Sequence, residues 1–319
     1  MNFCLLKDCE PIVSSTIESV RRGSQRVSSI LAAFLISLSF SVDASRISIL
    51  EVIPTESISP EIAGVQGLEY FDGRLWMANG RGTDANMPGR MPTVYSYDQS
   101  GGALSSFPTC SFRNGNYCAD GASALAFDGE NLWISGSDQG AIFKVDPQSG
   151  EVLSLKSNLG FSPFSLSWDG SFLWIGDFRN YLHKFDVATN KVVETIELDW
   201  LIKPWGAVWI NGGILTTQWY DQNSPLNALI LFDPSTNSII DSWSGLDILP
   251  RALAFDGKHV WMADGVTRSS GPASVGNRLY KIDLPGLAVP VPATVMLIAV
   301  GLVGFGLKRD AKARHPARA

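Results

Sequence analysis

A short apolar run, a tight turn and a second apolar strand recur five times along the 319-residue chain. The runs cover residues 67–70, 124–127, 165–168, 206–209 and 252–255, and the second strands are centred on Trp76, Trp133, Trp174, Leu215 and Trp261. In every copy the second residue of the run lies eight positions before that centre. Successive centres are 57, 41, 41 and 46 residues apart, a period typical of propeller blades.

Two further strands complete each predicted blade. A third run closes on an aspartate in every repeat, at Asp98, Asp146, Asp186, Asp233 and Asp283. A turn and a fourth strand follow, as in residues 151–155 and 191–196. Pairs such as Asp72-Gly73 stand between the first two strands, where they favour the positive φ of a hairpin turn. We interpret these pairs as turns rather than calcium loops, because they recur where a turn is needed.

The fifth repeat predicts how the ring closes. It ends after Asp283 with no fourth strand before the linker 284–286, whereas residues 46–53, ahead of the first repeat, have strand composition. This N-terminal segment can supply the missing strand and so remove an exposed sheet edge. The sequence therefore predicts an all-β fold, a five-bladed β-propeller over residues 45–285, with the large aromatic side chains packed between neighbouring blades.

Residues 1–44 have the pattern of a secretory signal peptide with a long n-region. Arg21, Arg22 and Arg26 precede an apolar run over 30–42, and Val42-Asp43-Ala44 offers small residues for cleavage. The long stretch before the run raises the alternative that translation starts further downstream. An uncleaved amphipathic anchor is the other alternative.

The C-terminal segment, residues 286–319, predicts a transmembrane helix with a basic tail. The span 289–307 is apolar, and as a helix it would be about 28 Å long, close to the thickness of the hydrocarbon core. Lys308, Arg309, Lys312, Arg314 and Arg318 follow it. Such a tail stays on the cytoplasmic side and leaves the propeller outside.

The residues at this end resemble a known sorting signal. Val289-Pro290-Val291-Pro292-Ala293, an apolar helix with internal glycines and a short basic tail are similar to the VPLPA-like form of the PEP-CTERM class. The commonest form has glutamate where Val291 stands, and Asp310 interrupts the basic cluster. The resemblance implies cleavage by an exosortase-type membrane protease and release toward the cell surface or its matrix. A plain C-terminal anchor is the alternative.

Cysteine usage and charge agree with export. Once the signal is removed only Cys110 and Cys118 remain, and an even pair in an oxidising compartment favours a disulfide. Their spacing, with no histidine nearby, does not resemble a zinc site, and we expect neither a metal nor a cofactor. The net charge is −6, and because basic residues are concentrated at the two ends the propeller is acidic, which argues against nucleic acid.

Loop length points to one face of the propeller. The segment between second and third strands is short in two repeats but long at residues 79–92, 218–226 and 264–277. In an up-and-down blade these loops emerge on the same face as the connection into the next blade, such as the cysteine-containing segment 107–121. Loops on a rigid scaffold are where binding usually resides. We therefore expect a ligand site on that face.

Two rings of residues lie at the predicted mouth of the channel on this face. One comprises Gln66, Ser123, Phe164, Trp205 and Arg251; the other comprises Asn79, Gly136, Asp177, Gln218 and Asp264, with Trp219 and Arg268 in the long loops. We select Gln66, Asn79, Trp205, Gln218, Trp219, Arg251, Asp264 and Arg268 as ligand-binding candidates. Amides, carboxylates, arginines and tryptophans around a concavity suit a sugar or a polar peptide end. The alternative is a polar ring that orders water and caps strand ends.

A second resemblance bears on activity. Val65-Gln66-Gly67-Leu68-Glu69-Tyr70 is similar to the opening blade of the five-bladed glutamine cyclotransferases, and Trp219 matches a tryptophan of their site. The resemblance implies Gln66 and Trp219 as pocket residues. Where that family has an acidic residue after the second strand's aromatic, this chain has Met77. The group expected to transfer a proton is therefore missing, and cyclisation of N-terminal glutamine is not expected.

These observations predict an exported, surface-associated propeller that binds a polysaccharide or an envelope protein through its elaborated face, without catalysis. The alternative is an extracellular enzyme, a lyase or a glutamine cyclotransferase-like protein, using carboxylates of Asp177, Asp264 or Glu69. A purely structural coat component is a third hypothesis, for which the face would be dispensable.

Overall fold

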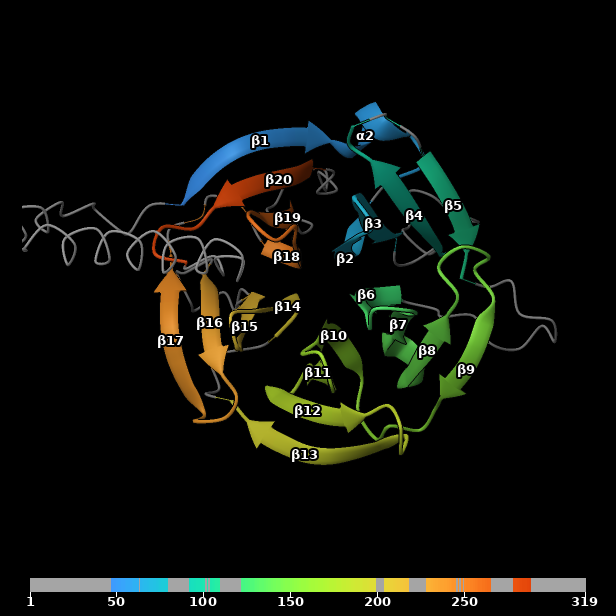
Figure 1. Cartoon of the computed structure of the whole chain (residues 1–319), viewed down its shortest axis with the longest axis vertical. Helices are drawn as coiled ribbons and strands as arrows, with labels where there is room; N and C mark the ends of the chain where they lie inside the picture. Colours follow the sequence, from blue (N-terminus) through green and yellow to red (C-terminus); the bar gives the residue numbers. More distant parts are fainter. Residues whose placement is uncertain are drawn as a thin grey trace, which may run out of the picture. The chain divides into compact units, whose positions relative to one another are not determined.

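The computed structural model describes residues 47–62, 64–79, 92–100, 102, 104–109, 122–198, 204–217, 228–244, 246, 248, 250–264 and 278–287. Within them lie five four-stranded antiparallel sheets arranged around one axis (Figure 1). The chain is thus an all-β five-bladed propeller, as predicted. The signal segment, both remaining cysteines and the sorting segment from residue 288 lie outside the described residues, so those predictions stand as such.

The blades follow one another in chain order. Blade 1 holds β2 (Val65–Phe71), β3 (Arg74–Asn79), β4 (Thr93–Asp98) and β5 (Leu104–Pro108). Blade 2 holds β6 (Ala122–Phe127), β7 (Leu132–Gly136), β8 (Ala141–Val145) and β9 (Val152–Lys156). Blade 3 holds β10 (Pro163–Trp168), β11 (Leu173–Asp177), β12 (Tyr181–Asp186) and β13 (Lys191–Glu197), and blade 4 holds β14 (Ala207–Ile210), β15 (Gly213–Thr217), β16 (Leu229–Asp233) and β17 (Ser238–Trp243).

Blade 5 is assembled from both ends of the propeller. It contains β18 (Pro250–Phe255), β19 (Val260–Asp264) and β20 (Arg278–Asp283), and its outer strand is β1 (Ser48–Pro54) (Figure 1). The antiparallel pairing of β1 with β20 runs from Ser48 opposite Asp283 to Pro54 opposite Arg278. The predicted closure of the ring by an N-terminal strand is confirmed.

The hydrophobic core lies between the blades rather than within one centre. Five clusters of buried side chains each join two neighbouring blades: 4 with 5, 5 with 1, 1 with 2, 3 with 4 and 2 with 3. The centre of each second strand packs toward the next blade, at Trp76, Trp133, Trp174, Leu215 and Trp261. The repeated aromatics are therefore packing residues, as the sequence predicted.

The inner strands β2, β6, β10, β14 and β18 begin on one face of the ring and run to the other. On the first face the second strands end, the third strands begin and the chain passes from blade to blade; we call it the connection face. The long segments around residues 80–91, 218–227 and 265–277 lie outside the described residues. They join strand ends that belong to this face.

Helix is nearly absent from the described residues. A four-residue helix, α2 (Thr55–Ile58), follows β1, and a single 3-10 turn, η1 (Ser137–Gln139), joins β7 to β8. Neither is long and apolar enough to cross a membrane. The predicted span 289–307 belongs to the part of the chain that the structure does not describe.

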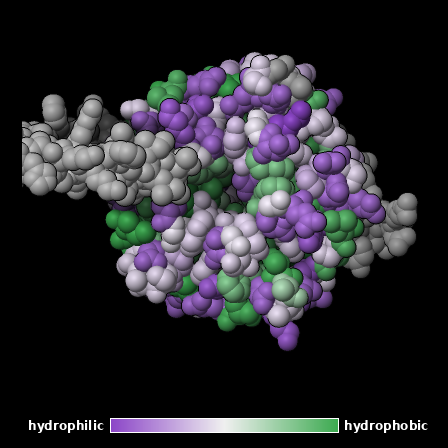
Figure 2. Space-filling model, in the orientation of Figure 1, coloured by the Kyte–Doolittle hydropathy of each residue, from purple (hydrophilic) through white to green (hydrophobic). Residues whose placement is uncertain are grey.

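The outer strands carry exposed aliphatic side chains around the circumference. Four of them contain a β-bulge, and in each the residue left unpaired is an aliphatic with about half of its surface exposed: Leu50, Leu153, Val193 and Ile240. Apolar patches separated by polar residues are visible around the rim in Figure 2. Bulges at an outer strand disturb its regular edge and so discourage pairing with other chains.

Candidate functional site

The mouth of the central channel on the connection face is built at β-bulges. In four blades the pairing of the inner strand with the second strand shifts by one residue near the start of the inner strand, at β2, β6, β10 and β18, whereas β14 pairs regularly. The residues set out of register there include Gln66, Ser123, Phe164 and Arg251. Because a bulge redirects the side chain of the extra residue, these positions are turned out of the ordinary strand pattern.

Three of the predicted candidates form one contact group at this mouth. The Nη2 of Arg251 donates a 2.8 Å hydrogen bond to the Oε1 of Gln66. The guanidinium carbon of Arg251 lies 4.4 Å from the ring centre of Trp205, a cation–π contact worth about 1 kcal/mol. The structure thus brings together blades 1, 4 and 5 through Gln66, Trp205 and Arg251, although they lie far apart in sequence.

Threonines at the end of β15 hold Trp205 in place through its neighbour Gly206. The N–H of Gly206 donates to the Thr217 hydroxyl (2.9 Å), and its carbonyl accepts the Thr216 hydroxyl (2.8 Å). A side chain at Gly206 would begin only 2.5 Å from the carbonyl oxygen of Arg251. The glycine is therefore required for the close approach that places Trp205 beside Arg251.

An aromatic row extends from the mouth into blade 3. Trp205 meets Phe164 edge to face at 5.8 Å between ring centres, and Phe164 meets Phe178 at 5.4 Å. Phe178, which follows β11, has 46% of its surface exposed. Below the mouth, a space lined by residues that include Gln66, Leu68 and Trp205 measures only about 10 Å³, roughly one water molecule. That space is too small for a sugar ring.

Two further candidates lie beside strand ends, where their side chains form hydrogen bonds with backbone groups. Asn79 is buried, and its Nδ2 donates to the carbonyl of Glu61 at 3.3 Å. Asp264 accepts the N–H of Arg278 at 3.0 Å and faces the Tyr280 hydroxyl at 3.4 Å. Burial raises the pKa of Asp264, and the hydrogen bonds and the charge of Arg278 offset this only in part.

The carboxylates that an enzyme on this face would need are separated. Asp177 lies in blade 3 and Asp264 in blade 5, with blade 4 between them. Glu69 does not lie on the connection face: it pairs with Trp76, two residues before the hairpin at the opposite end of β2. Its inclusion with the other two carboxylates was wrong, because four residues of extended strand carry it away from Val65 at the mouth.

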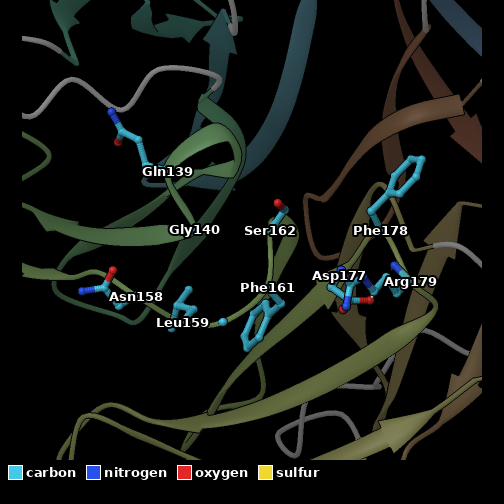
Figure 3. A pocket seen from close by; sticks show the side chains of 10 residues that line it. Gln139, Gly140, Asn158, Leu159, Phe161, Ser162, Asp177, Phe178 and Arg179 are labelled. Atoms are coloured by element: carbon cyan, nitrogen blue, oxygen red, sulfur yellow. Dashed lines mark hydrogen bonds between the residues drawn. The ribbon is translucent and has the colours of Figure 1, made fainter.

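A cleft of about 580 Å³ opens on the connection face between blades 2 and 3. It is lined by Gln139, Gly140, Asn158, Leu159, Gly160, Phe161, Ser162, Asp177, Phe178 and Arg179. Figure 3 shows Phe161 and Ser162 in the middle, Asn158 and Leu159 on one side, and Asp177, Phe178 and Arg179 on the other. The lining mixes amides, a hydroxyl, an arginine and two phenylalanines, which is the composition of a site for a polar ligand with apolar faces.

A buried Asp–His pair supports the floor of this cleft. The Oδ1 of Asp177 accepts the N–H groups of Arg179 (2.8 Å) and Tyr181 (2.9 Å). His183 lies with its Nε2 3.5 Å from the Asp177 Oδ2, and Phe161 stacks on the imidazole at 3.7 Å between ring centres. Burial works to raise the pKa of Asp177, but the adjacent His183 side chain and the hydrogen bonds from these two N–H groups outweigh it and hold the pKa below its usual value.

The remaining candidates fall outside the described residues. These are Gln218, Trp219 and Arg268 in the long loops, and the Cys110–Cys118 pair. Among the residues that the structure does describe, no group of three or more His, Cys, Asp or Glu side chains is arranged to hold a metal ion.

Of the residues that line the cleft, the sequence analysis named only Asp177. Loop length indicated the long loops, whereas Phe178 and Arg179 lie in the short turn between β11 and β12, and residues 158–162 connect blade 2 to blade 3. One signal was available: an aromatic and an arginine occupy a turn in which small polar residues are the norm.

A family model and solved structures match this chain. Residues 288–309 match the PEP-CTERM protein-sorting motif. The crystal structure of Myxococcus xanthus glutaminyl cyclase is similar, with a TM-score of 0.55 and 15% identity, covering 75% of this chain and 96% of that one. At this identity the likeness shows the fold alone. No curated protein matches the chain.

Two other solved structures are less similar. The Kuenenia stuttgartiensis hydrazine synthase has a TM-score of 0.42 at 14% identity, covering 66% of this chain and 58% of that one. A chain of the mitotic checkpoint complex has a TM-score of 0.43 at 13% identity, covering 82% of both.

The fold and the matched motif together define the class of protein. It is an exported five-bladed β-propeller with a C-terminal PEP-CTERM signal, sorted at the membrane and directed to the surface. Processing of that signal is the work of an exosortase.

Proposed function

We propose that the propeller binds a polar ligand, a matrix polysaccharide or an envelope protein, through its connection face and without catalysis. The observation that carries the proposal is the contact group of Gln66, Trp205 and Arg251 at the channel mouth. Three side chains from three blades converge there, and two of them, Gln66 and Arg251, occupy bulges near the start of their inner strands.

The absence of catalysis is proposed from the way the carboxylates are used. The Oδ1 of Asp177 is committed to two backbone N–H groups, and Asp264 accepts the N–H of Arg278. Both carboxylates therefore accept backbone hydrogen bonds at strand ends, and they do so in blades that are not neighbours. Acid–base cleavage of a glycosidic bond needs two such groups, one on either side of the bond.

The ends of the chain complete the proposal. Residues 1–44 direct export and are removed, Cys110 and Cys118 form a disulfide outside the cytoplasm, and the helix 289–307 holds the protein in the membrane until an exosortase cleaves near Pro290 and Pro292. The propeller then stays with the surface or the surrounding matrix through its ligand.

Retention on the matrix tests the function. We expect Arg251→Ala and Trp205→Ala each to move the protein from the matrix fraction to the medium, because each removes one half of the cation–π contact at the mouth. Ile240→Ala, which shortens a side chain on the outer rim that is 54% exposed, is the control and should be retained like the wild type. Thermal unfolding of all three verifies that they fold. Retention of the folded Arg251→Ala and Trp205→Ala proteins at the wild-type level would refute binding through this mouth.

A further inference from the structure

We propose that the cleft between blades 2 and 3 is a second part of the same binding site, and that the ligand is an extended polysaccharide chain lying across both. This inference rests on the proposed function and deepens it, because it selects the polysaccharide over the envelope protein and assigns residues that were not candidates before.

The size and lining of the cleft fit sugar rings. Its volume of about 580 Å³ lies within the range of small-molecule sites. Phe161 and Phe178 offer aromatic faces, on which the apolar C–H face of a sugar ring can stack. Gln139, Asn158 and Ser162 supply the donors and acceptors that hydroxyl groups need.

The mouth and the cleft are continuous. The aromatic row that begins at Trp205 reaches Phe178 through Phe164, with ring centres 5.8 Å and 5.4 Å apart, and Phe178 itself lines the cleft. A ligand that stacks at the mouth can therefore continue over Phe164 into the cleft without leaving the surface. The space among the inner strands at Leu68 is about 10 Å³, too small for a sugar ring, so the proposed path of the polysaccharide runs along the face.

An arginine stands at each end of this path. Arg251 lies at the mouth, and Arg179 has its side chain exposed at the cleft. Guanidinium groups bind sugar hydroxyls and carboxylates through their fixed fork of donors. Asp177, the carboxylate among the lining residues, is buried, and its Oδ1 already accepts two backbone N–H groups.

The cleft is poorly suited to a peptide in extended form. Peptides commonly bind by adding a strand to a free sheet edge. Here the strand that borders the cleft, β11, is paired on both sides by β10 and β12. The free edges of blades 2 and 3 lie on the inner strands β6 and β10, at the channel, and on the outer strands β9 and β13, at the rim. The lining offers side chains rather than a strand edge, which favours a carbohydrate.

The test is how binding affinity depends on the length of the polysaccharide fragment. The full protein would be titrated calorimetrically with the matrix polysaccharide of the producing cells, after partial hydrolysis and size fractionation. We expect long fragments to bind more tightly than short ones, because only long fragments reach both parts. Phe178→Ala should weaken the binding of long fragments by roughly fivefold to tenfold, the loss typical of one aromatic contact, and leave short fragments at the mouth unaffected.

Two further variants separate the possible outcomes. Arg179→Ala, another exposed position in the cleft, should also affect only long fragments, whereas Leu153→Ala, 52% exposed on the rim, should affect neither. If Phe178→Ala and Arg179→Ala bind long fragments like the wild type while Arg251→Ala does not, the cleft proposal is overturned and the mouth stands. If no fragment binds, the polysaccharide inference is overturned, and binding of an envelope protein at the mouth is decided by the retention experiment. If Arg251→Ala binds every fragment like the wild type, the proposed function fails as well.

Discussion

Trp133, Trp174 and Trp261 share a partner that stands five positions before each of them. The Oδ2 of Asp128, Asp169 and Asp256 accepts the indole Nε1–H of the tryptophan at 2.8, 2.8 and 3.1 Å. The Oδ1 of the same aspartate accepts two backbone N–H groups of the hairpin, as Asp128 does from Glu130 and Asn131. One carboxylate therefore ties the first hairpin of the blade to its packing residue.

In blades 1 and 4 the first hairpin turn is built differently. Their Asp72 and Asn211 stand one position later, inside the turn, and adopt φ of 52° and 53°. Phe71 occupies the position of the missing aspartate and stacks on Trp76 at 4.6 Å, and within the described residues the Nε1 of Trp76 finds no hydrogen-bond acceptor. In blade 4 the centre is Leu215, which needs none. The dipeptides that look alike in the sequence thus have two roles.

A matched pair of variants tests this distinction. Asp128→Asn would place an amide donor against the Nε1–H of Trp133, so we expect it to lower the free energy of unfolding by about 1 to 2 kcal/mol. Asp72→Asn keeps a residue that tolerates positive φ and should change it by less than about 0.5 kcal/mol. Chemical denaturation of both proteins gives the comparison. Equal losses would show that the indole bond contributes nothing specific.

Glu69 predicts a dependence of stability on pH. It lies partly buried between blades 1 and 2 and accepts the N–H groups of Tyr70 (2.8 Å) and Phe127 (3.1 Å). Burial outweighs these bonds and raises its pKa to about 7 from 4.5. Because the folded state holds the proton more tightly, the stabilisation is complete below pH 4.5 and is lost as the pH rises through 7.

The measurement is the free energy of unfolding between pH 5 and pH 8. In the wild type Glu69 should account for a decrease on the order of 2 kcal/mol across this interval. Glu69→Gln, which resembles the protonated form, should remove that part of the decrease. Parallel curves for the two proteins would mean that Glu69 does not titrate in this range.

At the scale of elements, the strands were predictable and the bulges were not. Apolar runs at a fixed distance from an Asx-Gly turn predict paired strands, and all five repeats show them. A bulge depends on which residues face each other across a pair, and the sequence does not record that register. The offset of Gln66 and Arg251 from the inner strand could be read from the sequence, but the reason that they meet lies in the bulges.

The cleft shows a second limit of prediction from sequence. Its two sides, the connection around Phe161 and the turn at Phe178, come from segments that carry no repeat signature. They meet only because blades 2 and 3 pack side by side, and His183 provides the surface on which Phe161 stacks. Pairwise contacts of this kind require the ring to be assembled first.

At the scale of the whole molecule, β1 closes the ring more by pairing with β20 than by burying apolar side chains. Ile49, Leu50 and Val52 are about half exposed, and from this strand Ile53 packs against the cluster that joins blades 5 and 1. The strand therefore contributes little buried apolar surface. Its main role is to pair with β20, which would otherwise present an open edge in the blade that joins the last repeat to the first.

Truncation of the chain measures that role. A protein that starts at residue 55 should unfold at a temperature lower by on the order of 10 °C than one that starts at residue 46, and it should associate through the open edge of β20. A synthetic peptide of residues 46–54 should restore both properties by taking the place of β1. The same peptide carrying Ile53→Asp should fail, because this change puts a charge against the cluster between blades 5 and 1. A truncated protein that stays monomeric and melts like the longer one would show that the ring closes through side-chain packing alone.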